Sequence, residues 1–309
     1  MKIYHNIEEV GRVKNAVVTV GTFDGVHKGH RKLINEVCRK AKAIGGESVI
    51  VTFDPLPRRI LKPREDIKMI STLEEKIEAF SRLCVDHLLI IRFTCEFAKT
   101  SGEDFLKKYI IEPFGLKAFV IGYDHHFGND RQGDIEFLTR MSKKYAFDVD
   151  RIAEEKIDDT ALSSSKIREA ILKGDMPTAN AFLGYRYSMS GIVVKGNQLG
   201  RKLGFPTANI EPEYGKLIPA YGVYAVLVKW NNKLYGGMSN IGIRPTLKEH
   251  QLTVEVNIFD FNHNIYGEKI TIYFVQHTRE EKKFRDLELL RRRLIIDKIK
   301  VSKILENIL

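Results

Sequence analysis

Two histidines stand three positions apart in a glycine-rich segment that is suited to phosphate. The segment reads GTFDGVHKGH over residues 21–30, with His27 and His30 near its end. It follows an apolar run and opens a helical pattern. Glycines let the backbone approach a phosphate closely, and the free amides at the start of a helix favour anions. Imidazole groups on the first turn can donate to the same phosphate, which suits nucleotidyl transfer.

A histidine pair alone is more often a surface or capping feature. Here the pair comes with glycines and a strand-to-helix transition, which capping does not require. A metal site is the weaker interpretation, because no third ligand follows nearby in the sequence. We therefore treat His27 and His30 as the catalytic candidates, and expect further nucleotide contacts from their neighbours Gly21, Phe23, Asp24 and Gly25.

A serine cluster forms a second candidate anion site. Residues 162–168 read LSSSKIR, at the start of a helical pattern. Taken alone, such serines most often cap the helix, but their hydroxyls and amides can also face an anion. Arg168 adds a forked donor for phosphate. The expected nucleotide-binding residues are Ser163, Ser164, Ser165 and Arg168.

A third segment, GNQLGRKLGFPTAN over residues 196–209, combines glycines with basic residues. Its spacing is not that of a Walker A motif, yet a glycine-rich turn can cradle phosphates. Thr207 and Asn209 present oxygens on one side of an extended chain, and such hard ligands suit Mg²⁺. Without further support, an ordinary turn-rich loop explains the segment equally well. The expected nucleotide-binding residues are Gly196, Gly200, Arg201, Gly204, Pro206, Thr207 and Asn209.

The first half of the chain alternates strand-like and helix-like segments. Strands are expected at 16–21, 47–53, 85–93 and 116–122, with helices at 29–43, after 71–75, at 101–112 and at 134–146. Thr72 and Glu75 have capping-box spacing. This alternation predicts an α/β fold with a doubly wound parallel sheet, which binds ligands at the carboxyl ends of its strands.

The second half is built from short β-rich segments separated by glycine and proline, beginning near Tyr187. That pattern predicts a small antiparallel β-barrel, with a hairpin turn near 231–233. The stretch from about Arg279 to Leu309 has helical periodicity. The expected domains are residues 1–184, a nucleotidyltransferase domain, and residues 185–309, a barrel with a terminal helix.

Composition places the chain among ordinary globular proteins. Of its 309 residues, 43% are hydrophobic and 29% are charged. No apolar run approaches the ~20 residues of a membrane span, and the first residues lack a signal-peptide pattern; we expect a cytoplasmic protein. The net charge is +10, but the sequence has no basic motif interleaved with aromatic residues. Nucleic acid is therefore not an expected partner. The three cysteines, Cys38, Cys84 and Cys95, are expected to be buried reduced thiols.

The first two segments together resemble the nucleotidyltransferase superfamily with H-x-G-H and I-S-S-T-x-x-R motifs. The motif G-x-F-D-G-x-H-x-G-H is similar to the one in the adenylyltransferase module of bacterial FAD synthetases. In that family the region that matches residues 121–128 also lines the nucleotide site. The resemblance therefore adds Asp124 to the expected nucleotide contacts.

The third segment resembles the signature G-R-x-x-G-F-P-T-A-N of riboflavin kinases. So do YGVY at 221–224, SNIG at 239–242 and VEVNIFDF at 254–261. In that family the acidic residue that matches Glu255 is the catalytic base. Read without the family, Glu255 is only an outward polar residue on a strand. The stretch from Arg279 to Leu287 resembles the family's closing helix, which helps to hold the flavin.

The motif sets occur in the order found in bifunctional FAD synthetases. The resemblance implies that riboflavin and ATP yield FMN and ADP, and that FMN and ATP yield FAD and pyrophosphate, with Mg²⁺ as the metal. Two alternatives remain open. One is a different H-x-G-H transferase fused to an unrelated barrel, and the other is a nucleic-acid-binding regulator with degenerate enzyme domains.

Overall fold

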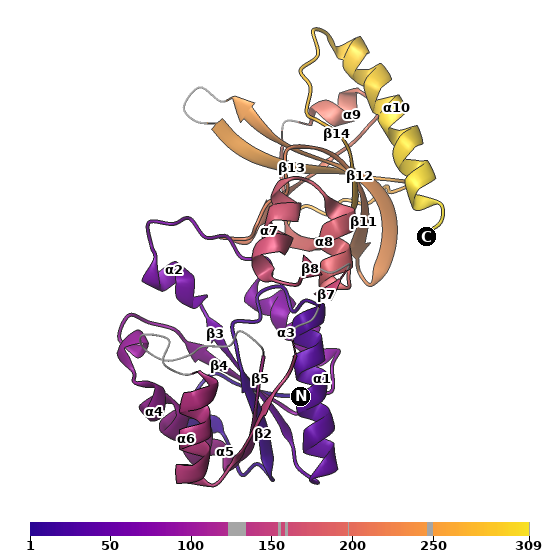
Figure 1. Ribbon diagram of the computed structural model, residues 1–309. Coiled ribbons are helices and arrows are strands. Elements are labelled where there is room, and N and C mark those ends of the chain that lie inside the picture. The colour runs from indigo at the N-terminus through magenta and orange to yellow at the C-terminus, as the bar shows by residue number, and fades with distance from the viewer. Residues whose placement is uncertain (123–133, 154–155, 158–159, 197, 246–249, 309) are drawn as a thin grey trace. The chain divides into compact units, whose positions relative to one another are not determined.

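The structure is a computed structural model, and it describes residues 1–122, 134–153, 156–157, 160–196, 198–245 and 250–308. The chain forms two compact units, Met1–Ser164 and Ser165–Leu309, which are described separately below (Figure 1).

The first unit contains a six-stranded, all-parallel sheet. Its strand order is β1-β4-β3-β2-β5-β6, so the order reverses between β2 and β5. A reversal of this kind creates a crevice at the carboxyl ends of the two strands, where ligands bind in doubly wound sheets. The strands are β1 (Lys2–Tyr4), β2 (Ala16–Val20), β3 (Ser48–Asp54), β4 (His87–Arg92), β5 (Leu116–Ile121) and β6 (Asp148–Arg151).

Helices cover both faces of this sheet. On one face, α1 (Lys28–Ala43) and α3 (Leu73–Ser81) bury apolar side chains such as Ile34 and Phe80 against the sheet. The other face is covered by α4 (Gly102–Phe105), the π-helical turn η3 (Leu106–Ile111), α5 (Glu112–Phe114) and α6 (Ile135–Tyr145). Shorter elements are η1 (Ile7–Glu9), α2 (Pro57–Leu61), η2 (Phe97–Lys99), β7 (Lys156–Ile157) and β8 (Thr160–Ala161).

The predicted α/β architecture is therefore confirmed. All four expected strands are present, and the capping box of α3 forms between Thr72 and Glu75. The sheet also contains β1 and β6, which the sequence analysis did not predict. They are short and lie at the two edges of the sheet, where half-buried strands carry little apolar periodicity.

The second unit contains a closed antiparallel barrel with the order β10-β13-β12-β11-β14-β9, as predicted. Asn231 and Asn232 both have positive φ and form the two-residue hairpin turn expected between β11 and β12. The strands are β9 (Ser188–Val194), β10 (Ala208–Pro212), β11 (Gly222–Trp230), β12 (Lys233–Pro245), β13 (His250–Ile258) and β14 (Lys269–Arg279).

Two helices before the barrel, α7 (Ser164–Leu172) and α8 (Met176–Leu183), are grouped with the second unit. The Asn180 side chain of α8 donates to the Phe274 carbonyl on β14 and accepts from the Tyr187 amide. The compact units thus divide near residue 164. The predicted boundary between residues 184 and 185 separates two activities. The division into compact units does not test where each activity begins, so this boundary remains a prediction.

The C-terminal helix begins later than the sequence periodicity indicated. Strand β14 continues to Arg279, and α10 spans Leu287–Leu305, with Asp286 as its N-cap. Arg279 pairs with Val223 of β11 and so belongs to the strand, and residues 280–286 form neither a strand nor a helix. None of the helices in the described ranges is long and apolar enough to cross a membrane.

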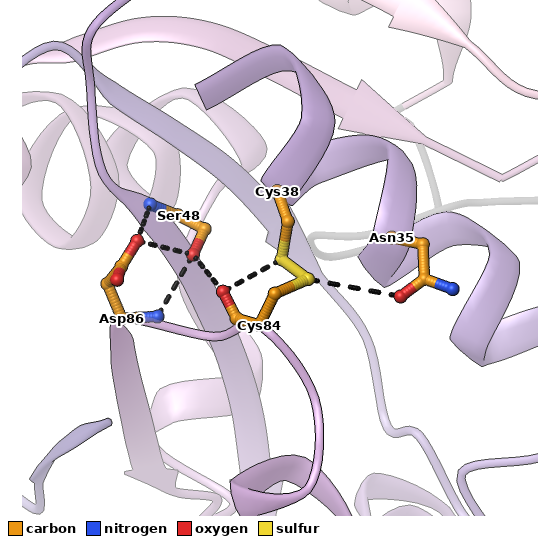
Figure 2. The surroundings of a disulfide bond; sticks show 5 residues. All are labelled: Asn35, Cys38, Ser48, Cys84 and Asp86. Carbon is orange, nitrogen blue, oxygen red and sulfur yellow. Dashed lines mark hydrogen bonds between the residues drawn. A yellow bond between two sulfur atoms is a disulfide. The ribbon is translucent and has the colours of Figure 1, made fainter. Parts of the chain in front are cut away.

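The expectation of buried reduced thiols is wrong. Cys38 on α1 and Cys84 in the turn after α3 form a disulfide, and Cys95 is a free, exposed cysteine. Figure 2 shows how Ser48 orders the same turn: its hydroxyl donates to the Cys84 carbonyl, and its amide donates to Asp86. Spacing along the sequence could not reveal the pair, because packing of α3 beside α1 brings the two cysteines together.

Candidate functional site

The Gly21–Lys28 loop leaves β2 at the point where the strand order reverses. Its backbone is strained, with positive φ at Phe23, Gly25 and Val26. The Phe23 ring folds back over Gly21, where a Cβ would lie 2.9 Å from the ring, so glycine is required there. The loop thereby delivers the histidines to the carboxyl edge of the sheet.

His27 is the N-cap of α1. Its Nδ1 accepts a hydrogen bond from the His30 amide at 3.3 Å. The two imidazole rings stack, with centroids 3.6 Å apart and planes inclined by 18°. Two rings this close cannot both be positively charged without strong repulsion. Capping and catalysis are therefore compatible roles for His27, since its ring orders the helix start and lies against His30.

His30 lies partly buried between His27 and the edge of the Phe23 ring. Burial lowers the pKa of His30 well below its usual range, and the charges of His27 and Lys76 lower it further. Its Nδ1 is buried and meets no hydrogen-bond partner among the described residues. At neutral pH the His30 ring is therefore neutral and carries one N–H donor.

Asp24, an expected nucleotide contact, is 3% exposed and anchors the loop. Its Oδ1 accepts from the amides of Ile70 and Ser71, at 2.9 and 3.1 Å. In return, the Gly25 amide donates to the Ser71 hydroxyl at 2.9 Å. These hydrogen bonds between the loop and residues 70–71 hold the loop in place.

The serine cluster reaches the same loop through Ser164, whose hydroxyl donates to the Asp24 carbonyl at 3.0 Å. Ser163 precedes α7, whereas Ser165 and Arg168 lie further along this helix in the second unit. Asp124 lies outside the described residues. The structure therefore brings together the glycine-rich loop, both histidines and Ser164, while roles for Ser165, Arg168 and Asp124 remain predictions.

The candidate site of the second unit is built on the loop between β9 and β10. A short helix, α9 (Leu199–Lys202), carries Arg201, and Gly204 follows it with φ of +81°. A Cβ on Gly200 would overlap the Phe205 carbonyl oxygen, and one on Gly196 would overlap the Asn209 side chain. The glycines thus let this turn fold closely onto the Phe205–Asn209 segment.

Thr207, Asn209 and Glu255 meet at the pairing of β10 with β13. Asn209 lies directly opposite Glu255 in the register, and the Thr207 hydroxyl donates to Glu255 Oε2 at 3.1 Å. The Asn257 side chain donates to the Pro206 carbonyl at 2.7 Å, and the Ser239 hydroxyl donates to the Glu255 carbonyl at 3.0 Å. The structure therefore unites three residues that the sequence analysis took from two separate motifs.

The structure adds a pocket of about 330 Å³ in the same unit. It lies between Phe205 and α10, and Ile295 and Ile299 contribute apolar surface. Arg279 binds the middle of α10 through the buried carboxylate of Asp297, at 2.7 Å. The sequence offered one signal for this pocket, a row of isoleucines on the helix. Such a row more often packs into an ordinary hydrophobic core.

Lys76 is a further residue that the sequence analysis missed. Its side chain is 2% exposed, and its charge acts on His30. A signal was present, because Lys76 occupies the apolar face of α3 together with Leu73, Ile77 and Phe80. Among the described residues, no group of three or more His, Cys, Asp or Glu side chains could hold a metal ion.

Comparison with known proteins identifies the family of each half of the chain. The sequence model of the FAD synthetase family matches residues 11–166, and that of the riboflavin kinase family matches residues 183–305. A bifunctional riboflavin kinase/FMN adenylyltransferase of Listeria monocytogenes is 37% identical, over 89% of this chain and 87% of the relative. The protein of the same description from Bacillus subtilis is 34% identical, over 99% and 96%.

The fold is also known from a crystal structure described as a macrolide-efflux protein from Streptococcus pneumoniae. It superimposes with a TM-score of 0.88 at 30% identity, over 97% of this chain and 98% of the other. The riboflavin kinase match excludes an H-x-G-H transferase fused to an unrelated barrel. The chain belongs to the family of bifunctional riboflavin kinase/FMN adenylyltransferases.

Proposed function

We propose that the second unit phosphorylates riboflavin with ATP to give FMN, and that the first unit adenylylates FMN with a second ATP to give FAD and pyrophosphate. The observation that carries this proposal is the presence of two separate clusters in one chain. The first unit holds the stacked His27 and His30 at a helix start, and the second holds Thr207 against Glu255.

In the adenylyl transfer, the FMN phosphate attacks the α-phosphate of ATP and pyrophosphate leaves. No covalent enzyme intermediate is required. The neutral His30 ring and the amides at the start of α1 stabilise the negative charge that develops on phosphate oxygens. The proposed nucleotide contacts of this reaction are Gly21, Phe23, Asp24, Gly25, Asp124, Ser163, Ser164, Ser165 and Arg168.

In the kinase reaction, the Glu255 carboxylate accepts the proton of the riboflavin 5′-hydroxyl as that oxygen attacks the γ-phosphate of ATP. The glycine-rich turn and Arg201 hold the phosphates. We assign the flavin ring to the pocket between Phe205 and α10, whose apolar lining suits a planar aromatic ligand. The remaining proposed nucleotide contacts are Gly196, Gly200, Gly204, Pro206, Thr207 and Asn209.

The oxygen donors around Glu255 fit a Mg²⁺ ion. Thr207 and Asn209 offer a hydroxyl and an amide oxygen beside the carboxylate, and hard oxygen ligands are the ones that Mg²⁺ prefers. Bound there with ATP, the ion neutralises phosphate charge. We assign the protein to the cytoplasm, with ATP, riboflavin, FMN and FAD as its small-molecule partners and with neither nucleic acid nor membrane among them.

One experiment tests both activities. Purified protein is incubated with riboflavin, ATP and Mg²⁺, and the flavins are separated by chromatography over time. We expect FMN to form first and FAD to follow, and both to require the metal. Accumulation of FMN without FAD, also when FMN is supplied, would contradict the role of the first unit. Binding of generic RNA without flavin turnover would instead favour a regulator with degenerate enzyme domains.

A further inference from the structure

Lys76 occupies a place where a lysine is costly. It lies on the face of α3 that packs against the sheet, and its side chain is 2% exposed. Removing an ammonium group from water carries a penalty of several kcal/mol unless close partners replace the water. An apolar residue of similar length would pack there without this penalty.

The partners of Lys76 are neutral and distant. Its Nζ lies 3.5 Å from Thr52 Oγ1 and 3.4 Å from the Phe53 carbonyl oxygen, both at the carboxyl end of β3. Among the described residues, no carboxylate forms an ion pair with it. The buried ammonium group is thus held in place and only partly satisfied.

These contacts lead directly to the histidine loop. Thr52 donates its hydroxyl to the Thr22 carbonyl at 3.3 Å, so Lys76, Thr52 and Thr22 form a chain from α3 to the start of the loop. Burial lowers the pKa of Lys76, and the carboxylates of Asp24 and Asp54 partly offset this effect by favouring its ammonium form. His27 and Lys76 are the charged groups that face His30.

The proposed site must bind ATP, which carries several negative charges. His30 is neutral, and stacking prevents the two histidines from being charged together. The two carboxylates that face Lys76 add negative charge. Lys76 is therefore a buried cation whose charge acts on His30 and is favoured by Asp24 and Asp54.

We infer that Lys76 is a positioning residue for adenylyl transfer, which holds the Gly21–Lys28 loop through Thr52 and supplies fixed positive charge behind His30. The inference rests on the proposed function of the histidine site. It assigns Lys76 two effects that can be separated, one through the hydrogen-bond chain and one through charge.

Three variants of the full chain separate these effects. K76M removes the charge and the contact while retaining the length of the side chain. T52V breaks the link to Thr22 and leaves the charge in place. K42M is the matched control, because it removes one positive charge from the exposed surface of α1, the helix that carries His30.

Two readouts are measured for each variant. One is the titration of the His30 ring, followed by NMR on histidine-labelled protein and assigned with H30Q. The other is the pH profile of FAD formation from supplied FMN, with riboflavin phosphorylation by the same chain as the internal standard.

Removing the Lys76 charge makes a protonated His30 less unfavourable, so the pKa of His30 rises and the acid limb of the FAD profile moves to higher pH. We expect K76M to show both shifts, and to form FAD about 10²-fold more slowly at neutral pH. T52V slows FAD formation without moving the limb, and K42M matches the unchanged protein.

A folded K76M protein with an unchanged His30 titration and acid limb would overturn the inference, whatever its turnover. If K76M does not fold, K76R decides. The arginine retains the charge, so a folded K76R protein must keep the His30 titration and the acid limb of the unchanged protein. A shift of both to higher pH in spite of the retained charge would refute the inference. Failure of the proposed function is recognised separately, because H30Q would then form FAD at the normal rate.

Discussion

The hydroxyl of Thr207 donates a hydrogen bond to the carboxylate of Glu255, with 3.1 Å between Oγ1 and Oε2. The two residues lie 48 positions apart in the sequence, and the pairing of β10 with β13 brings them together. A proposed metal ligand and a proposed general base therefore share one contact, and their variants should fail in different ways.

Replacing Glu255 with glutamine removes the base and keeps the shape of the side chain. We expect riboflavin phosphorylation to slow by about 10²-fold or more, with riboflavin binding retained. Steady-state kinetics and flavin fluorescence titration measure the two quantities. E211Q is a suitable control, since Glu211 is an exposed carboxylate on β10. Near-normal turnover in E255Q would eliminate the general-base role.

Replacing Thr207 with alanine removes one proposed oxygen ligand of Mg²⁺. The defect should appear mainly as weaker use of the Mg²⁺–ATP complex, and a higher Mg²⁺ concentration should partly restore the rate. T207S retains the hydroxyl and should behave almost normally. Kinase rates measured as a function of Mg²⁺ test this, and an equal defect in both variants at every concentration would speak against metal binding by the hydroxyl.

Alanine at His27 or His30 should abolish most FAD formation and leave FMN formation intact. Loss of one donor that stabilises developing charge typically slows a reaction by about 10²–10³-fold. H27A should also lower the melting temperature slightly, because His27 is the N-cap of α1. Both flavin products are quantified in the same reaction mixture. Unchanged FAD synthesis in H30A would remove the phosphate role of that ring.

The Cys38–Cys84 bond should stabilise the first unit. It joins residues 46 positions apart, and closing a loop of this length contributes about 4 kcal/mol in the chain-entropy estimate. We expect the double variant C38S/C84S to melt at a lower temperature than the oxidised unchanged protein. Reductant should lower the melting temperature of the unchanged protein and leave that of the double variant as it is. C95S is the control.

Alkylation provides an independent measurement of the same bond. Before reduction, a thiol reagent should label Cys95 alone, which is exposed and free. After reduction, Cys38 and Cys84 should be labelled as well. Labelling of all three cysteines in the oxidised, folded protein would show that the disulfide does not form in solution.

Two C-terminal fragments test where the kinase begins. Residues 185–309 and residues 165–309 should both form FMN and no FAD. The longer fragment should be more stable, because α8 buries Met176 and Leu183, and each of these side chains contributes about 1.5–3 kcal/mol. Thermal melting and FMN assays compare them. A folded but inert longer fragment would refute the division of activities.

The amino-acid sequence determined by itself the features that depend on neighbouring residues. The strand-to-helix transition around His27 and His30, the capping box of α3 and the Asn231–Asn232 turn are set by local periodicity and local hydrogen bonds, and all are present. Alternating segments were sufficient to predict a parallel sheet followed by a barrel. The family followed from two uninterrupted motifs, because each keeps its residues adjacent along the chain.

Only the tertiary structure decided which distant residues meet. Register between β10 and β13 places Glu255 against Thr207. Packing of α3 on the sheet brings the charge of Lys76 to bear on His30 and places Cys84 beside Cys38. Pairing with β11 likewise assigns Arg279 to β14, although the helical periodicity began at this residue. Such contacts depend on strand order and on how apolar faces fit together, which local patterns leave undetermined.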